Sequence, residues 1–261
     1  MILFIFEGTR REPTLYKTME DLFFPKDNQR IICSFGNNIY NLYKKMAPAN
    51  SDESDFTEDI VSVLKESLKD QSSNSLKEIE LVSDISEVYL FFDYDGHNQN
   101  KSKTLQQDVL NTQLQKLLSF FNDETGNGKL YINYPMVESI RYTKKLPDSN
   151  YNSYKVELAN ITNFKQAVND FSDYPNLDFA AFRIGRKNNR LHVPLSTDEI
   201  DKVKENWNLL KKQNLEKAIY LCKGTQSQQK IFEMQLQDFI TSQKAVSILN
   251  AFPLFLYEYF G

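Results

Sequence analysis

Acidic residues follow three hydrophobic segments that are expected to be β-strands. The segments are 2–6, 88–92 and 130–132, and the acids that come after them are Glu7, Asp93, Asp95 and Glu138. In an open α/β sheet, ligands bind at the carboxyl ends of the strands. Carboxylates gathered there repel one another unless a hard cation lies between them, and oxygen ligands of this kind suit Mg²⁺ or Mn²⁺. The spacing therefore predicts a divalent metal site.

The local sequence around these acids fits strand ends. Neighbouring side chains alternate along a strand, so Asp93 and Asp95 would share a face, and Gly96 lets the backbone turn directly afterwards. Glu7 is followed by Gly8, which permits a sharp turn, and by Pro13, which suits the first turn of a helix. The competing interpretation of these residues is a set of solvated acids in surface loops.

Elements that could position the acids alternate along the first half of the chain. Strands are expected at 2–6, 30–34, 87–92 and 130–133, and helices at 13–24, 37–46, 56–68 and 104–121. Such alternation predicts an α/β fold with a mainly parallel sheet flanked by helices. The second half is expected to be largely helical, with helices at 163–171, 196–214 and 226–249 and one strand at 179–184. Ser196 and Glu199 form a capping box at the start of the second of these helices.

We expect a core domain over 1–147 and a mostly helical accessory region over 148–261 that packs on it. The apolar segment 245–260 is too short and too interrupted to span a bilayer, so it is expected to dock on the core. The 261-residue chain has 41% hydrophobic residues and a net charge of −4, so any nucleic-acid contact needs a local basic patch. No signal peptide is expected, and Cys33 and Cys222 are expected to be reduced, which favours the cytoplasm.

The strand motifs resemble those of a known fold. A strand followed by Glu7 and Gly8, and later a strand followed by Asp93 and Asp95, is similar to the TOPRIM fold of topoisomerases, primases and OLD-type nucleases. Glu7-Gly8 with Glu12-Pro13 and Tyr16 resembles the opening of RloB-like TOPRIM proteins of bacterial phage-defence loci. The resemblance covers about residues 1–140 and lies at the level of short motifs.

The resemblance implies roles for the matching positions. Glu7 would act in acid/base chemistry and metal binding, and Asp93 and Asp95 would bind Mg²⁺ or Mn²⁺. Many members have a third acid where this chain has His97, and Glu138 could supply that carboxylate from the next strand. A carboxylate-held Mg²⁺ neutralises phosphate charge, and Glu7 or a second ion activates the attacking water.

Basic residues near the acids could contact a substrate phosphate. The candidates are Arg10, Arg11, Lys144 and Arg186, and solvated basic turns are the alternative interpretation for the last two. His192 is expected to be a packed strand residue. The sequence has no zinc-ligand spacing, Ser-His-Asp signature or P-loop, so any ATP hydrolysis would require an ATPase partner.

These observations lead to the hypothesis of a Mg²⁺-dependent nuclease that cleaves DNA or tRNA, as a toxin-like effector of phage defence acting with an ATPase partner. The alternative is a catalytically silent module that regulates such a partner. A primase-like nucleotidyl transferase is disfavoured because no zinc ribbon or nucleotide-binding motif is visible. The sequence leaves open whether the chain is a monomer or a homo-oligomer, and whether it is active alone.

Overall fold

The structure is a computed structural model, and it describes residues 1–26, 29–47, 56, 58–71, 74–94, 104–172, 186–188, 191–193 and 196–261. The chain divides into two compact units. The first consists of Met1–Pro13 and Lys26–Ile132, and the second of Thr14–Pro25 and Asn133–Gly261. The domains expected from the sequence, 1–147 and 148–261, stay a prediction.

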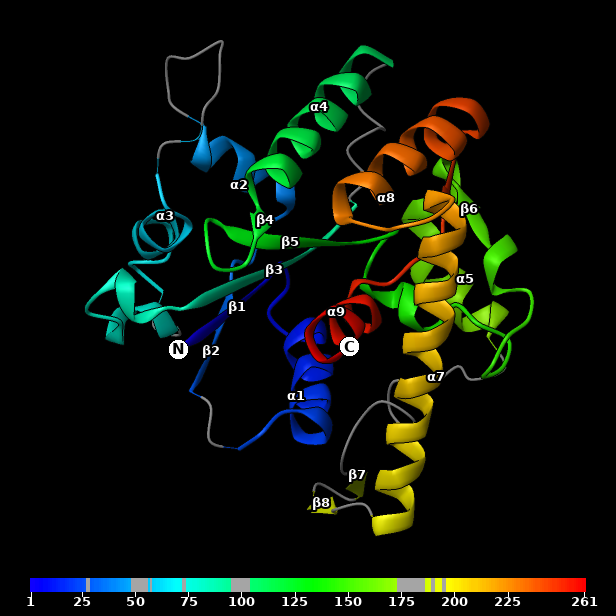
Figure 1. The fold of residues 1–261 in the computed structure, drawn as a ribbon, viewed down its shortest axis with the longest axis horizontal. Coiled ribbons are helices and arrows are strands. Elements are labelled where there is room, and N and C mark those ends of the chain that lie inside the picture. The colour runs from blue at the N-terminus through cyan, green and yellow to red at the C-terminus, as the bar shows by residue number, and fades with distance from the viewer. Residues whose placement is uncertain are drawn as a thin grey trace. The chain divides into compact units, whose positions relative to one another are not determined.

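A five-stranded, mainly parallel sheet in the order β2-β1-β3-β5-β4 forms the centre of the first unit (Figure 1). Its strands are β1 (Ile2–Phe6), β2 (Arg30–Ser34), β3 (Glu87–Asp93), β4 (Asn122–Asp123) and β5 (Gly128–Asn133). The strand β1 pairs in parallel with both β2 and β3, whereas β4 and β5 form an antiparallel hairpin. All five residues of β1 are buried, as expected for a central parallel strand that is covered on both faces. The α/β class predicted from the sequence is confirmed.

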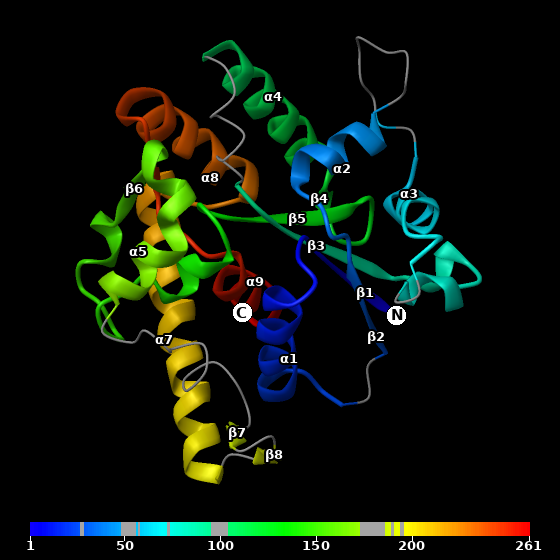
Figure 2. The ribbon, with the colours of Figure 1, turned by 180° about the vertical axis from the view of Figure 1, so that it is seen from behind.

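Helices accompany the sheet, and their starts are fixed by polar caps. They are α2 (Ile39–Met46), α3 (Ile60–Ser67), α4 (Thr104–Phe120) and the 3₁₀ turns η1 (Ser75–Glu78) and η2 (Val82–Asp84). The side chain of Asn38 accepts from the backbone of Asn41 at 3.0 Å, and Asp59 caps α3 in the same way. Helices α2 and α4 lie side by side, as Figure 2 shows from behind.

The helix α1 (Arg11–Phe23) begins in the first unit and continues into the second. The second unit is largely helical, as predicted. Its other elements are η4 (Val137–Arg141), η5 (Tyr151–Ser153), β6 (Lys155–Glu157), η6 (Leu158–Asn163), α5 (Phe164–Phe171), β7 (Arg186–Asn188), β8 (Leu191–Val193), α7 (Thr197–Cys222), α8 (Gln228–Met234), the π-helical segment η7 (Gln235–Thr241), β9 (Ala245–Ser247) and α9 (Ala251–Phe260).

The capping box at the start of α7 is present as predicted, with Ser196 and Glu199 exchanging hydrogen bonds. The helix is longer than predicted, because its buried positions continue to Cys222. The helix predicted over 226–249 is confirmed over 228–241, as α8 and η7, and is wrong at its end. Its last part leaves the helix and forms β9, which pairs antiparallel with β6. The strand predicted over 179–184 lies outside the described residues.

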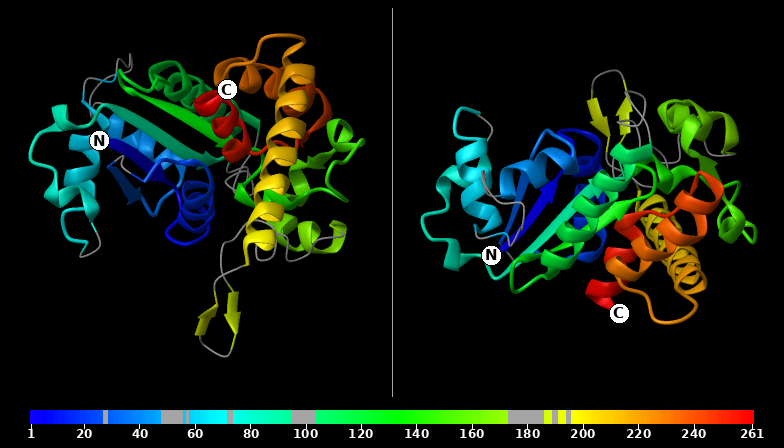
Figure 3. Two further views of the ribbon diagram at one scale, coloured as in Figure 1. Left: turned by 60° about the horizontal axis from the view of Figure 1, so that its bottom comes forward. Right: turned by 90° about the horizontal axis from the view of Figure 1, so that it is seen from above.

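The C-terminal segment is buried within its unit. Side chains from Ala245 to Leu256 are buried, and α9 lies beside α7 (Figure 3). The side chain of Asn250 caps α9 by accepting from Phe252 at 3.1 Å, and its amide donates to Val137 at 3.0 Å. Within the described residues no helix is long and apolar enough to cross a membrane. The segment therefore contributes to a core.

Two phenylalanines of α9 provide a matched test of this burial. Phe252 is fully buried, whereas Phe260 is 40% exposed. Phe252→Ala should lower the free energy of unfolding by about 3–5 kcal/mol because it leaves a cavity, and Phe260→Ala should lower it by about 1 kcal/mol or less. Urea denaturation measures both changes. Equal losses in the two variants would contradict the burial described for α9.

Candidate active site

Two of the predicted acids meet at one edge of the parallel sheet. Strands β1 and β3 are neighbours, with Phe6 opposite Phe91, so the residues that follow them emerge together. The backbone of Glu7 donates to Phe91 at 3.0 Å, which extends the pairing by one residue. The backbone N–H of Asp93 then donates to Oε2 of Glu7 at 3.0 Å. This bond orients the Glu7 carboxylate towards the carboxyl end of β3.

Hydrogen bonds at Glu7 and at Gly8 stabilise the turn after β1. The carbonyl of Glu7 accepts from the backbone of Gly36 at 2.9 Å, just beyond β2. The backbone of Gly8 donates to Oε1 of Glu12 at 3.2 Å, and Glu12 is only 5% exposed. Because Glu12 lies in the first turn of α1, its negative charge is also favourable at the helix N-terminus. These contacts fix the direction in which Glu7 leaves the strand.

Glu12 is a positioning residue that the sequence analysis did not assign. Its spacing from Gly8 carried the signal, because an acid in the first turn of a helix can reach back to the preceding turn. A Cβ atom added at Gly8 would lie only 2.5 Å from Oε2 of Glu12. The absence of a side chain at Gly8 therefore lets the Glu12 carboxylate come close to the backbone. Gly8 therefore serves the Glu12 contact as well as the turn.

Arg10 and Arg11 lie in the same turn as Glu7. Arg10 is exposed, and Arg11 is partly buried at the first position of α1. Both arginines lie within four residues of Glu7 along the chain. Arg is well suited to phosphate because its planar fork can make two hydrogen bonds. Their role in phosphate binding stays a prediction.

The other two predicted metal ligands are Asp95 and Glu138. Asp95 and its neighbour His97 lie outside the described residues. Glu138 belongs to the second unit, where it is 3% exposed and its Oε1 lies 3.4 Å from Nζ of Lys165. Its membership of the metal site stays a prediction.

The two remaining basic candidates also belong to the second unit. Nζ of Lys144 lies 4.5 Å from the centre of the Phe171 ring, a cation–π contact. Arg186 begins β7 and pairs with Val193 of β8. His192 is in β8, which agrees with the strand predicted for it. The proposed contacts of Lys144 and Arg186 with phosphate stay predictions.

The donor atoms at the strand edge suit a hard divalent cation. Glu7 and Asp93 offer carboxylate oxygens, which Mg²⁺ and Mn²⁺ prefer. Over the described residues, no group of three or more Asp, Glu, His or Cys side chains could hold a metal ion. Two carboxylates with several waters can still bind Mg²⁺, which usually keeps part of its hydration shell. The pair therefore fits such an ion in ligand type, with Asp95 as the predicted third ligand.

The cysteines do not offer an alternative chemistry. Cys33 and Cys222 are free and buried. Burial raises the pKa of the Cys33 thiol to about 12, so that thiol stays protonated at neutral pH. Since the thiolate is the nucleophile, Cys33 is unsuited to attack a substrate.

A buried lysine in the second unit is another residue that the sequence analysis did not single out. Lys217 of α7 is fully buried, and its Nζ donates to the carbonyls of Tyr151 at 3.0 Å and Tyr154 at 2.7 Å. Desolvation by burial lowers the pKa of Lys217 well below its ordinary value. Because no part of the side chain reaches solvent, its role is to join α7 to the turn η5.

Comparison with known proteins finds no matching family model, no matching curated protein and no matching solved structure. The geometry at the strand edge therefore carries the functional argument.

A substitution at Gly8 tests the Glu12 contact. In Gly8→Ala the new methyl group should displace the buried Glu12 carboxylate and break its bond to the backbone, which should cost about 1–3 kcal/mol of stability. Gly126→Ala is the matched control, because its Cβ would meet Asp123 at an ordinary 3.4 Å. Thermal and urea unfolding measure both. A Gly8→Ala protein as stable as Gly126→Ala would show that Glu12 is not held by this turn.

The pH dependence of stability tests the burial of Lys217. The pKa of Lys217 in the folded state lies below the ordinary value of 10.5. Between these two pKa values, the unfolded state binds one more proton than the folded state. Stability should therefore rise with pH across that window. Lys217→Met should lack this contribution, whereas Lys212→Met should keep it because Lys212 is 73% exposed on the same helix. Urea denaturation at about pH 7 and about pH 9.5 compares them, and identical pH slopes in both variants would contradict the assignment.

Proposed function

We propose that the protein is a metal-dependent nuclease whose active site is the carboxyl edge of β1 and β3. The observation that carries the proposal is the meeting of Glu7 and Asp93 there, joined by the 3.0 Å bond from the Asp93 backbone to Oε2 of Glu7. Ligands of open α/β sheets bind at this edge. Carboxylates at this edge, with arginines in the adjoining turn, match what cleavage of a phosphodiester requires.

The arrangement gives each residue a role. Glu7 is oriented by the Asp93 backbone and acts as general base towards an attacking water. Asp93, with Asp95, holds a Mg²⁺ or Mn²⁺ ion, and Glu138 is a further candidate ligand. When bound, such an ion neutralises phosphate charge and lowers the pKa of a coordinated water. Arg10 and Arg11 attract the substrate phosphate to an edge that its own carboxylates would otherwise make repulsive.

The biological setting is proposed from the resemblance to TOPRIM proteins of phage-defence loci. We propose a cytoplasmic, toxin-like effector that cleaves DNA or tRNA and acts with an ATPase partner. The net charge of −4 supports regulated access to nucleic acid, because it gives little non-specific affinity for a polyanion.

The decisive experiment measures cleavage by wild type and Glu7→Gln. Each protein is incubated with plasmid, single-stranded DNA and total tRNA, with Mg²⁺, with Mn²⁺ and with EDTA. Gln cannot accept a proton at neutral pH, so Glu7→Gln should lower the cleavage rate about 10²–10⁴-fold while nucleic-acid binding is retained. Asp93→Asn should also lose activity, and EDTA should abolish it in the wild type.

Glu87→Gln is the matched control, because Glu87 lies at the opposite end of β3 and accepts from the Tyr89 hydroxyl at 2.8 Å. It should cleave at the wild-type rate. Cleavage by Glu7→Gln at the wild-type rate would refute the proposed role of Glu7. A folded wild type that cleaves none of the substrates with either metal would favour the alternative, a silent module that regulates an ATPase.

A further inference from the structure

The second unit contains a pocket that the strand-edge site does not use. It lies between the last turn of α7 and the π-helical segment η7, and its volume is about 840 Å³. This falls in the range of small-molecule sites, about 300–1,000 Å³. A π-helix is rare, and such segments occur frequently at functional sites. The whole lining belongs to the second unit.

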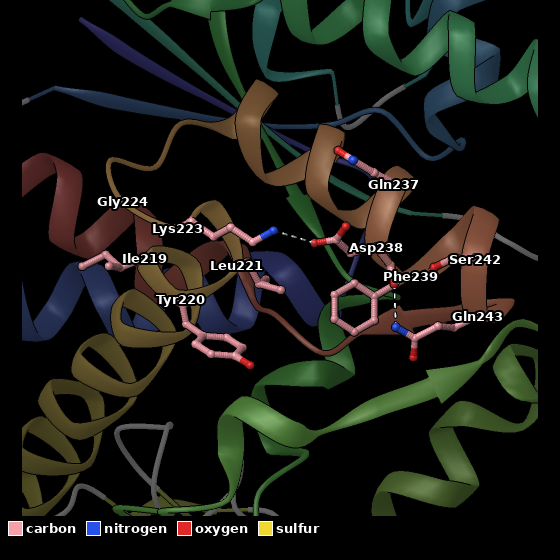
Figure 4. Close-up of a pocket in the computed structure, with 10 residues that line it drawn as sticks. All are labelled: Ile219, Tyr220, Leu221, Lys223, Gly224, Gln237, Asp238, Phe239, Ser242 and Gln243. Atoms are coloured by element: carbon pink, nitrogen blue, oxygen red, sulfur yellow. Dashed lines mark hydrogen bonds and ion pairs between the residues drawn. The ribbon is translucent and has the colours of Figure 1, made fainter.

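Two aromatic rings from different elements extend into the pocket. Tyr220 comes from α7 and Phe239 from η7, and both rings lie on the same side of the ion pair that joins these elements (Figure 4). Tyr220 is 63% exposed, and within the described part of the chain its side chain has no hydrogen-bond or ring partner. A large, mostly exposed ring that lines a pocket offers a face for stacking.

Polar groups next to the rings retain capacity for a ligand. The amide of Gln243 donates one hydrogen bond to the carbonyl of Asp238 and accepts one from Nζ of Lys155 at 2.7 Å. A glutamine amide has two donors and two acceptor positions, so one of each remains on Gln243. These contacts hold the amide in place while leaving it able to bond the edge of a base.

A positive charge lies at the same pocket. Nζ of Lys223 is 3.6 Å from Oδ2 of Asp238, and Lys223 is 75% exposed. Ion pairs that are this exposed contribute little to stability. The ammonium group of Lys223 can therefore exchange Asp238 for a stronger anion such as a phosphate. Lys223 is held at the end of α7 in the left-handed backbone region, with φ of 54°.

We propose that this pocket binds a nucleotide. The base stacks on Tyr220 and Phe239, the amide of Gln243 bonds the base edge, and the ammonium of Lys223 contacts the phosphate. Stacking on an aromatic side chain accepts any base, and a glutamine amide pairs well with adenine. An aromatic peptide side chain would use the rings but would leave the ammonium and the amide without a matching group. The proposal does not depend on the metal site at the edge of the sheet.

The test is calorimetric titration of the full chain carrying Glu7→Gln, in EDTA, so that cleavage and strand-edge metal play no part. The ligands are the four nucleoside monophosphates, adenosine and a six-nucleotide adenylate strand. At least one monophosphate should bind. Tyr220→Ala should weaken the affinity for it about 10-fold or more, whereas Tyr220→Phe should keep the affinity of the wild type.

The adenylate strand distinguishes two sources of the nucleotide. Tighter binding of the strand than of AMP identifies a site that anchors nucleic acid, and equal or weaker binding identifies a site for a free nucleotide. Both results support the proposal.

Lys223→Asn tests the phosphate contact, because asparagine tolerates the left-handed conformation while removing the charge. This substitution should weaken the binding of AMP but leave the binding of adenosine unchanged, because adenosine has no phosphate. Lys244→Asn is the matched control, since Lys244 is also exposed, has a φ of 51° and does not line the pocket. The proposal fails if no monophosphate binds at millimolar concentration, if Tyr220→Ala binds as the wild type does, or if acetyl-phenylalanine amide binds and AMP does not.

Discussion

Parallel pairing of β1 with its two neighbours is the constraint on which the strand-edge site depends. A parallel ladder sends adjacent strands out of the sheet in the same direction, so the residues that follow them share one edge. With Phe6 opposite Phe91, the Glu7 carboxylate comes within hydrogen-bonding distance of the Asp93 backbone. A shift of one residue in this register would turn every side chain of the strand to the other face and separate the pair. The buried apolar side chains of β1 hold the register.

Hydrogen bonds on both sides of the turn after β1 set the direction in which Glu7 leaves the strand. The carboxylate of buried Glu12 accepts a hydrogen bond from the backbone N–H of Gly8, and the backbone N–H of Gly36 donates to the carbonyl of Glu7. These bonds satisfy backbone groups that would otherwise need water, and Arg10, three residues after Glu7, is exposed. The proposed catalytic role of Glu7 gains from such support, because the orientation of its carboxylate is set before substrate arrives.

The second unit depends on polar groups inside its core. The carboxamide oxygen of Asn214 accepts from the Tyr151 hydroxyl and from the backbone of Asn250, both at 2.9 Å, and thereby joins α7 to η5 and to the start of α9. Lys217, one turn further along α7, bonds two carbonyls of the same η5 region. Buried polar groups are costly unless they are satisfied, so these bonds allow few alternative packings. The same helix ends at the pocket that carries Tyr220 and Lys223, so its packing also positions that pocket.

Elements whose signals are local could be predicted from the sequence alone. Apolar runs ending in acids located β1 and β3, the Ser196–Glu199 box located the start of α7, and the order of elements gave the α/β class. The sequence also placed Glu7 and Asp93 at strand ends, because that needs only the strand boundaries. The tertiary structure decided which strands are neighbours, where the buried face of α7 stops, and that residues 245–247 form a strand. That last segment looks helical by pattern, but pairing with β6 satisfies its backbone instead. Lys217 was missed because its role depends on burial and on partners that periodicity along the chain does not specify. The spacing of Glu12 from Gly8 allows the contact between them, but only the structure shows that Glu12 is buried.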